Sequence, residues 1–111
     1  MKVHVLIRQD LGMTRGKICA QGAHAVLGLY KELLERDPVA YTQWASLDFE
    51  QATYSAMSSE DLYKAQAAAR RIGIPGAYVV CDAGRTQIAP MTPTVCALGP
   101  ATEEQVRAVI F

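Results

Sequence analysis

The chain has few cysteines, no long apolar run and no net charge. The first two of these shortages each exclude a class of protein. Its three cysteines, Cys19, Cys81 and Cys96, include no C-x-x-C pair and cannot supply the framework of a disulfide-stabilised secreted domain. They lie in apolar stretches, which predicts buried free thiols in a reducing compartment. No apolar run approaches the roughly 18–20 residues that a membrane-spanning helix requires.

The N-terminal residues lack the continuous apolar region of a signal peptide. Lys2 is followed by the alternating stretch Val-His-Val-Leu-Ile-Arg, which predicts a cytoplasmic protein and leaves a trimmed organellar form open. The length of 111 residues predicts a single domain, residues 1–111. With 50% hydrophobic and 20% charged residues, the composition is typical of a globular protein.

Charge is unevenly distributed although its net value is zero. Residues 1–30 hold four bases against the single acid Asp10, residues 31–63 hold two bases against seven acids, and residues 64–111 hold five bases against three acids. The neutral chain therefore presents a basic face if its first and last thirds meet in space. Random scatter of these charges is the alternative.

Hydrophobic patterns and turn residues predict four strands and four helices. Strands are expected at residues 3–9, 51–57, 77–81 and 92–98, and helices at residues 15–36, 38–47, 59–72 and from about Thr102 onward. Asp37 and Ser58 are the expected N-caps of the second and third helices.

The order of these elements predicts an α/β fold with three layers, α/β/α, around a mixed four-stranded sheet. Helical connections join the first three strands, which favours parallel pairing through right-handed crossovers. The segment 82–91 is too short for such a crossover, so the last strand is expected to be antiparallel. Sites in such sheets lie beyond the carboxyl ends of the parallel strands, where segments 8–17, 82–91 and 92–94 are expected to converge.

The helix predicted at residues 15–36 is apolar over most of its circumference. At 100° per residue, its polar residues form one narrow stripe: Lys17, Gln21 and His24, continued by Lys31, Glu32 and Glu35 as solvated surface. The remaining residues predict a helix that packs on several sides. The stripe is either the solvated edge of the helix or the floor of a site.

The segment from Gly12 to Ile18 follows a predicted strand and opens a predicted helix, as a phosphate-binding P-loop does. It has one residue too few between its glycines, and Ile18 stands where a P-loop carries the Ser or Thr that binds magnesium. These differences exclude nucleoside-triphosphate hydrolysis. Amides at a helix N-terminus with Lys17 in the first turn still form a site for an anion or a developing oxyanion. The alternative is a solvent-facing lysine.

Asp82 ends a predicted strand at the same edge of the sheet. A carboxylate there can orient or deprotonate a water, and Thr86 and Gln87 can hold a substrate hydroxyl or carbonyl; the alternative is that Asp82 caps its own turn. Arg85 is either a phosphate contact or a solvated loop residue. No histidine has neighbours at metal-ligand spacing, and no nucleophile motif occurs. The sequence predicts no metal, no cofactor and direct attack by water.

Two stretches together resemble the signatures of the type II peptidyl-tRNA hydrolase family. The first is Arg8-x-Asp10-Leu11-x-Met13-x-x-Gly16-Lys17-x-x-Ala20-Gln21-x-x-His24-Ala25. The second runs from Asp82-Ala-Gly-Arg through Pro90 and is followed by Thr94-Val95 and Gly99-Pro100. The similarity extends from about Met1 to Val109. One departure is Met91, which stands where family members commonly have glycine.

The resemblance implies metal-free hydrolysis of the ester that links a peptide to the terminal ribose of tRNA. It implies catalytic roles for Lys17, Gln21, Asp82 and Thr86. We expect His24, Thr94 and Gln87 to line the pocket, and tRNA phosphates to be contacted by Arg8, Arg15 and Arg85, with Arg70 and Arg71 as further candidates.

Peptidyl-tRNA is the expected partner, a membrane is not, and a homodimer is a further candidate. A non-catalytic RNA-binding or adaptor module on the same fold is the alternative function. An esterase for another nucleotide-linked acyl group is a second alternative.

Overall fold

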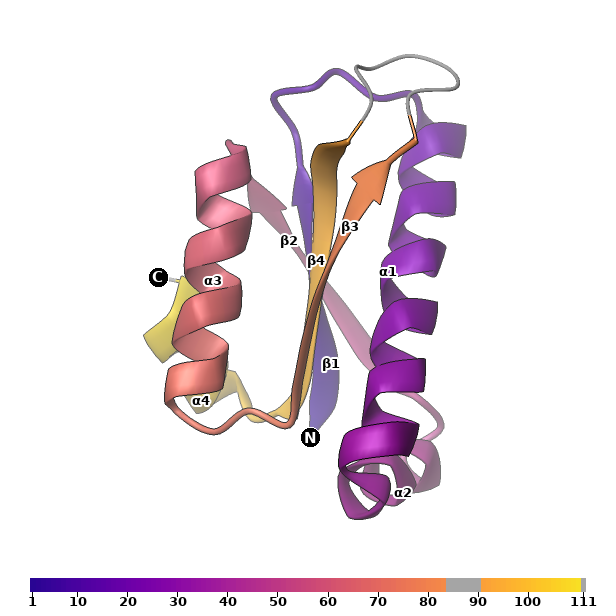
Figure 1. Ribbon diagram of the computed structural model, residues 1–111, viewed down its shortest axis with the longest axis vertical. Coiled ribbons are helices and arrows are strands. Elements are labelled where there is room, and N and C mark those ends of the chain that lie inside the picture. The colour runs from indigo at the N-terminus through magenta and orange to yellow at the C-terminus, as the bar shows by residue number, and fades with distance from the viewer. Residues whose placement is uncertain (84–90, 111) are drawn as a thin grey trace.

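The structure, a computed structural model, describes residues 1–83 and 91–110. One sheet lies between two helical layers, with α1 and α2 on one face and α3 and α4 on the other (Figure 1). The elements follow in the order β1 (Lys2–Arg8), α1 (Arg15–Arg36), α2 (Pro38–Ser46), β2 (Gln51–Ala56), α3 (Ser59–Arg71), β3 (Gly76–Asp82), β4 (Thr92–Ala101) and α4 (Glu103–Ile110).

The four strands lie in the order β2-β1-β4-β3. β1 pairs in parallel with β2, and β4 is antiparallel to both β1 and β3. The first three strands therefore share one direction and the last opposes them, which confirms the predicted three-layer α/β fold. The carboxyl ends of β1 and β3 and the start of β4 lie at one edge of the sheet, beside the N-terminus of α1 (Figure 1).

Helix caps fix the starts of the first three helices. The side chains of Thr14, Asp37 and Ser58 accept backbone N–H groups of Lys17, Ala40 and Asp61 at 3.2, 3.1 and 3.1 Å. Such a cap contributes about 1 kcal/mol to helix stability. The predicted caps at Asp37 and Ser58 are confirmed. β4 continues past the predicted end at Leu98 to Ala101, through a glycine and a proline that are poor strand residues.

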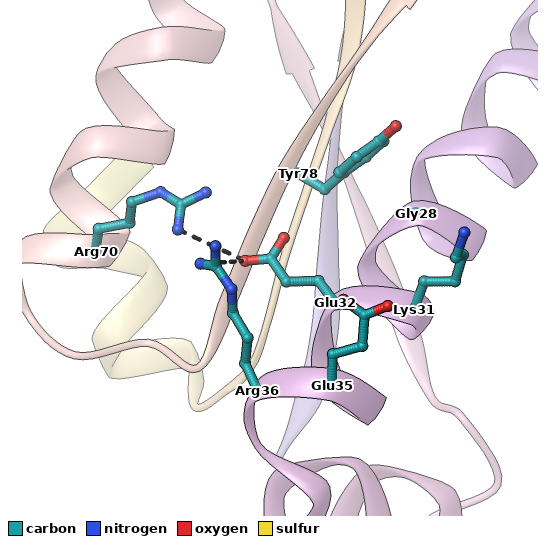
Figure 2. Close-up of a pocket in the computed structure, with 7 residues that line it drawn as sticks. All are labelled: Gly28, Lys31, Glu32, Glu35, Arg36, Arg70 and Tyr78. Carbon is teal, nitrogen blue, oxygen red and sulfur yellow. Dashed lines mark ion pairs between the residues drawn. The ribbon is translucent and has the colours of Figure 1, made fainter.

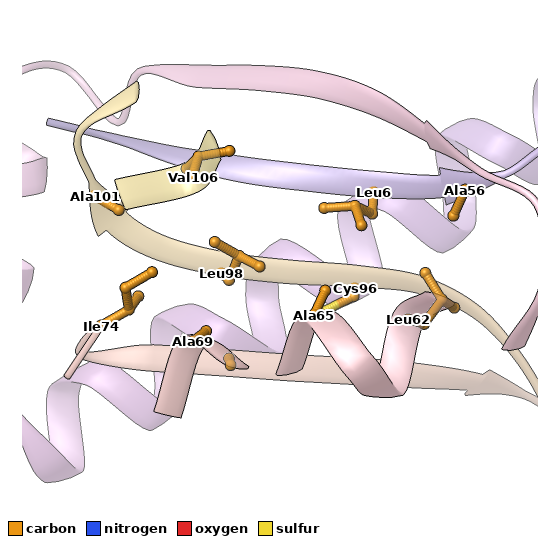
Figure 3. Close-up of a cluster of buried hydrophobic side chains, with 11 residues drawn as sticks. Leu6, Ala56, Leu62, Ala65, Ala69, Ile74, Cys96, Leu98, Ala101 and Val106 are labelled. Carbon is orange, nitrogen blue, oxygen red and sulfur yellow. The ribbon is translucent and has the colours of Figure 1, made fainter. Parts of the chain in front are cut away.

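The core is divided by the sheet into two clusters. The cluster under α3 and α4 joins strand residues to the apolar stripe of α3 (Figure 3), and its members include Leu6, Leu62, Ala65, Ala69, Ile74, Cys96, Leu98 and Val106. The cluster under α1 and α2 includes Val3, Val5, Leu29, Leu33, Trp44 and Val95. Full burial of a leucine or valine side chain stabilises the fold by about 1.5–3 kcal/mol.

Helix α1 buries one stripe, so the prediction that it packs on several sides is wrong. Its buried residues recur every fourth position, at Gln21, Ala25, Leu29 and Leu33, while Leu27 is 63% exposed. The reason is the strand order: α1 packs chiefly on β3 and β4, and its flank toward β1 and β2 stays open. Within the described residues, no helix is long and apolar enough to cross a membrane.

The three cysteines are free, as predicted, but only Cys96 is buried. Cys19 is exposed and Cys81 is partly exposed. The predicted burial fails at Cys19 because this residue lies on the open flank of α1, beside a groove formed with β1 and β2.

Candidate active site

Lys17 and Asp82 form an ion pair at the edge where the parallel strands end. Lys17 lies in the first turn of α1, and its Nζ donates to Oδ1 of Asp82, the last residue of β3, at 2.6 Å. The two side chains are 13% and 3% exposed, so solvent and salt screen the pair weakly. The predicted convergence of these two segments is confirmed.

Gln21 and Thr94 extend this pair into a buried hydrogen-bonded group. Gln21 lies one turn after Lys17 and donates from Nε2 to Asp82 Oδ1 at 3.3 Å, while Thr94 Oγ1 donates to Gln21 Oε1 at 2.7 Å. The amide orientation is fixed because its oxygen accepts from Thr94 and its nitrogen donates to Asp82. These four residues, Lys17, Gln21, Asp82 and Thr94, are named the carboxylate cluster below.

Arg8 braces the same edge of the sheet. Its Nε and Nη2 donate to the two carboxylate oxygens of Asp10 at 3.0 and 2.5 Å, and its Nη1 donates to the carbonyl of Pro93 at 3.0 Å. The hydrogen bonds between them raise the pKa of Arg8 and lower the pKa of Asp10. The hydrogen bonds of Arg8 connect the end of β1 to the start of β4, next to Thr94. The phosphate contact expected of Arg8 stays a prediction.

The remaining predicted site residues fall into two groups. Arg15 and His24 are exposed on α1, on either side of Lys17 and Gln21 in sequence. They are open to a substrate but stand outside the buried carboxylate cluster. The other three predicted residues, Arg85, Thr86 and Gln87, lie outside the described residues.

Met91 closes the segment that joins β3 to β4. Its backbone N–H donates to the carbonyl of Asp82 at 2.7 Å, and its φ of 62° places it in the left-handed region. Glycine adopts this conformation without the steric cost that a side chain brings. A glycine at this position, as is common in the family that the sequence resembles, therefore suits the backbone better than Met91 does.

The topology brings the basic first and last thirds of the chain together, as a basic face requires. β1 lies beside β4, and α1 packs on β3 and β4. Two cations at this edge, Arg8 and Lys17, are each paired with a carboxylate. Among the described residues of the edge, it is Arg15, at the exposed start of α1, that adds positive charge to the surface.

A hollow of about 300 Å³ lies near the C-terminal half of α1 (Figure 2). Glu32 points into it and is only 13% exposed, with Oε1 lying 3.7 Å from Arg36 Nη1 and 3.5 Å from Arg70 Nη1. The prediction that Glu32 is solvated surface is wrong, because Arg70 of α3 reaches it across β3. Arg70 also donates to the carbonyl of Ala77 at 2.9 Å, so part of its role is structural.

His4 is a buried histidine that serves the core. Its Nε2 donates to the carbonyl of Ala101 at 3.0 Å, which leaves Nδ1 to accept from the hydroxyl of Tyr54 at 3.0 Å in the neutral ring. Burial lowers the pKa of His4 below its ordinary value. Among the described residues, no group of three or more His, Cys, Asp or Glu side chains could hold a metal ion.

The carboxylate cluster combines three chemical capacities. A carboxylate can accept a proton from water, an ammonium at a helix N-terminus can stabilise an oxyanion, and an oriented amide can position a carbonyl or hydroxyl. These groups lie at the carboxyl edge of a mixed α/β sheet, where ligands of such folds bind.

The chain belongs to the family described as "Peptidyl-tRNA hydrolase PTH2", whose sequence profile matches residues 1–110. It is 41% identical over 105 residues to "Probable peptidyl-tRNA hydrolase 2" of Dictyostelium discoideum, covering 95% of this chain and 50% of that protein. It is 35% identical over 106 residues to "Peptidyl-tRNA hydrolase" of Methanocaldococcus jannaschii, covering 96% and 91%. It is 34% identical over 108 residues to the human "Peptidyl-tRNA hydrolase 2, mitochondrial", covering 97% and 60%. The chain thus spans half of the Dictyostelium relative and most of the archaeal one.

Proposed function

We propose that this chain hydrolyses the ester between the peptide and the terminal ribose of peptidyl-tRNA, releasing the peptide and free tRNA. The observation that carries the proposal is the buried contact of 2.6 Å between Lys17 and Asp82, at the edge of the sheet where substrates of such folds bind. The names of the relatives support the choice of substrate.

In the proposed reaction, Asp82 takes a proton from a water molecule as the water oxygen attacks the ester carbonyl carbon. The Lys17 ammonium and the amides at the start of α1 stabilise the negative charge that develops on the carbonyl oxygen. Collapse of the tetrahedral intermediate breaks the bond to the ribose oxygen, which receives the proton from Asp82. Water is consumed, and a carboxylic acid and a ribose hydroxyl are formed.

Gln21 and Thr94 position the reacting groups in this scheme. Thr94 fixes the Gln21 amide, and the amide in turn holds the Asp82 carboxylate. Thr86 and Gln87 are proposed to hold the ester and the ribose, and His24 to border the pocket.

Binding of tRNA is proposed to rest on phosphate contacts. Arg15 is an exposed cation two residues before Lys17, and Arg8, Arg85, Arg70 and Arg71 are the further proposed contacts. Phosphate contacts carry no sequence information. They also weaken with salt: for each contact, the logarithm of the binding constant falls by about 0.7–0.9 for every tenfold rise in salt concentration.

A non-catalytic RNA-binding module is the competing function. Such a module gains nothing from a carboxylate and an ammonium buried together. Removing two charges from water costs free energy, whereas hydrophobic residues in the same place would not carry this cost. The buried pair therefore favours an enzyme. The free thiols support a reducing compartment, and the cytoplasm is the proposed location. A second copy of the chain is the other proposed partner.

The test is hydrolysis of N-acetylated aminoacyl-tRNA in the presence of EDTA, followed as release of the acyl amino acid. We expect release by the wild type and loss of release in Asp82→Asn, with an unchanged circular dichroism spectrum. No release by the wild type contradicts the enzymatic function. Undiminished release by a folded Asp82→Asn protein contradicts the assigned site and leaves the activity standing.

A further inference from the structure

A groove of about 660 Å³ lies beside α1, over β1 and β2. Its walls include Ile18, Gly22 and Val26 of α1, Val5 and Ile7 of β1, and Thr53 of β2. None of the residues that line it is Lys, Arg, Asp or Glu. The groove exists because α1 packs chiefly on β3 and β4, so this half of the sheet face is open.

The groove adjoins the carboxylate cluster. Ile18 follows Lys17 directly, and Gly22 follows Gln21 directly, so the groove and the cluster share the first turns of α1. On the sheet, Ile7 pairs with Val95, the residue after Thr94. The groove therefore lies next to the position proposed for the ester.

The two flanks of α1 differ in chemistry. Lys17, His24 and Lys31 are spaced by seven residues, or about two turns, and share one flank. Cys19 and Val26, also seven residues apart, lie on roughly the opposite flank and face the groove. A peptidyl-tRNA has a similar division on either side of its ester: phosphates on one side, and on the other a peptide whose main-chain amides carry no charge.

The free edge of β2 borders the groove. β2 is one of the two outermost strands of the described sheet, and the carbonyls of Glu50 and Ala56 accept from Val3 and Gln9 on the β1 side. Because backbone groups alternate in direction along a strand, those of Gln51 and Thr53 point away from β1. An extended peptide can add to such an edge through its main chain, whatever its sequence.

We propose that this groove binds the peptide part of the substrate, taking its apolar side chains within the first residues beyond the ester. The inference rests on the proposed function and assigns the tRNA to the cationic flank of α1. It predicts that hydrolysis is faster for long apolar peptides than for a short acyl group.

The test compares two substrates built on the same tRNA. One carries a leucine-rich tetrapeptide, and the other is N-acetylglycyl-tRNA. Ala23 lines the groove and is exposed, so Ala23→Leu fills it without a buried clash. We expect the ratio of kcat/KM between the long and the short substrate to fall about tenfold in Ala23→Leu, which corresponds to about 1.4 kcal/mol, mainly through KM. Ala67→Leu, on the exposed face of α3, is the matched control and should keep the wild-type ratio.

Cys19 provides a second readout because it lines the groove and is exposed. Its alkylation by a maleimide, measured by mass spectrometry on Asp82→Asn protein, should slow with the long peptidyl-tRNA and not with deacylated tRNA. An equal loss of kcat/KM for both substrates, or no protection of Cys19, overturns the inference. A wild-type dimer that Ala23→Leu converts to a monomer also overturns it, because the groove is then a subunit interface. Hydrolysis of N-acetylglycyl-tRNA tests the proposed function separately.

Discussion

The Lys17 ammonium lies 2.6 Å from Oδ1 of Asp82, across a sequence separation of 65 residues. This contact ties the start of α1 to the end of β3, and both side chains are largely buried. Removing one partner of such a pair takes the opposite charge away from the buried group that remains, which costs about 3–5 kcal/mol. The pair therefore contributes to stability as well as to the proposed chemistry, and experiments must separate the two effects.

Replacing Lys17 and Asp82 one at a time, and then both together, separates the effect on stability from the effect on catalysis. Asp82→Asn and Lys17→Met should each lower the single-turnover hydrolysis rate by about 10²–10⁴. Lys17→Met should also lower the free energy of unfolding, measured in urea, whereas the double variant should recover much of that stability with no recovery of activity. Lys64→Met, at a lysine 73% exposed on α3, is the control. A double variant that regains activity would falsify the division of roles.

Thr94 offers a milder perturbation of the same cluster. Thr94→Val keeps the shape but removes the hydroxyl that donates to Gln21 Oε1 at 2.7 Å, leaving a buried acceptor without this donor, at a cost of about 1–3 kcal/mol. We expect kcat to fall about tenfold, near 1.4 kcal/mol, since the Gln21 amide loses its fixed orientation. Thr94→Ser retains the donor and should restore most of kcat. Equal rates for the Val and Ser variants would contradict the positioning role.

The element order and the meeting of Lys17 with Asp82 followed from local patterns. Caps, periodicity and short connections set the order, and parallel strands must bring their carboxyl ends to one edge. The open flank of α1 was missed because it depends on which strands the helix covers. Strand order is a tertiary property that the order of elements along the chain leaves undetermined.

Glu32 and Arg8 illustrate two further limits of prediction from the sequence. Burial of Glu32 depends on Arg70 of a different helix, and no spacing within α1 encodes that contact. The pairing of Arg8 with Asp10 is local, and the Arg-x-Asp pattern could have predicted it. Phosphate binding by Arg8 therefore competes with a partner two residues away.

His4 should make stability depend on pH. Burial lowers the pKa of His4 below 6.5, so the unfolded chain takes up a proton at a higher pH than the folded one. The contribution of His4 to the free energy of unfolding should therefore be constant above about pH 7 and fall as the pH decreases through 6.5 to the lowered value. Urea unfolding at several pH values measures this slope, and His4→Gln should flatten it. An unchanged slope in His4→Gln would show that other groups titrate there.

The cysteines should differ sharply in reactivity. Burial raises the pKa of Cys96 to about 12, and its side chain is inaccessible, whereas Cys19 is exposed. Because the thiolate is the reactive form, iodoacetamide at about pH 8 should modify Cys19 in the native protein and leave Cys96 unmodified. Mass spectrometry of the digested protein gives the rates, and unfolding in urea should equalise them. Rapid native alkylation of Cys96 would contradict its burial.

Two glycines of α1 should respond oppositely to alanine. A Cβ at Gly22 meets nothing within 4 Å, whereas one at Gly28 would overlap the ring of Tyr78, which extends toward α1 in Figure 2. Gly22→Ala should raise the free energy of unfolding by about 0.5–1 kcal/mol through helix propensity. Gly28→Ala should lower it by about 1–3 kcal/mol, because the tyrosine ring must move.

Removing the Tyr78 ring provides the control for the comparison of Gly22→Ala with Gly28→Ala. In a Tyr78→Ala background the clash is absent, so Gly28→Ala should there gain the same propensity benefit as Gly22→Ala. Thermal and urea unfolding of the four proteins in this cycle measure the coupling between the two positions. A Gly28→Ala effect that is equally unfavourable with and without the ring would place the strain elsewhere in α1.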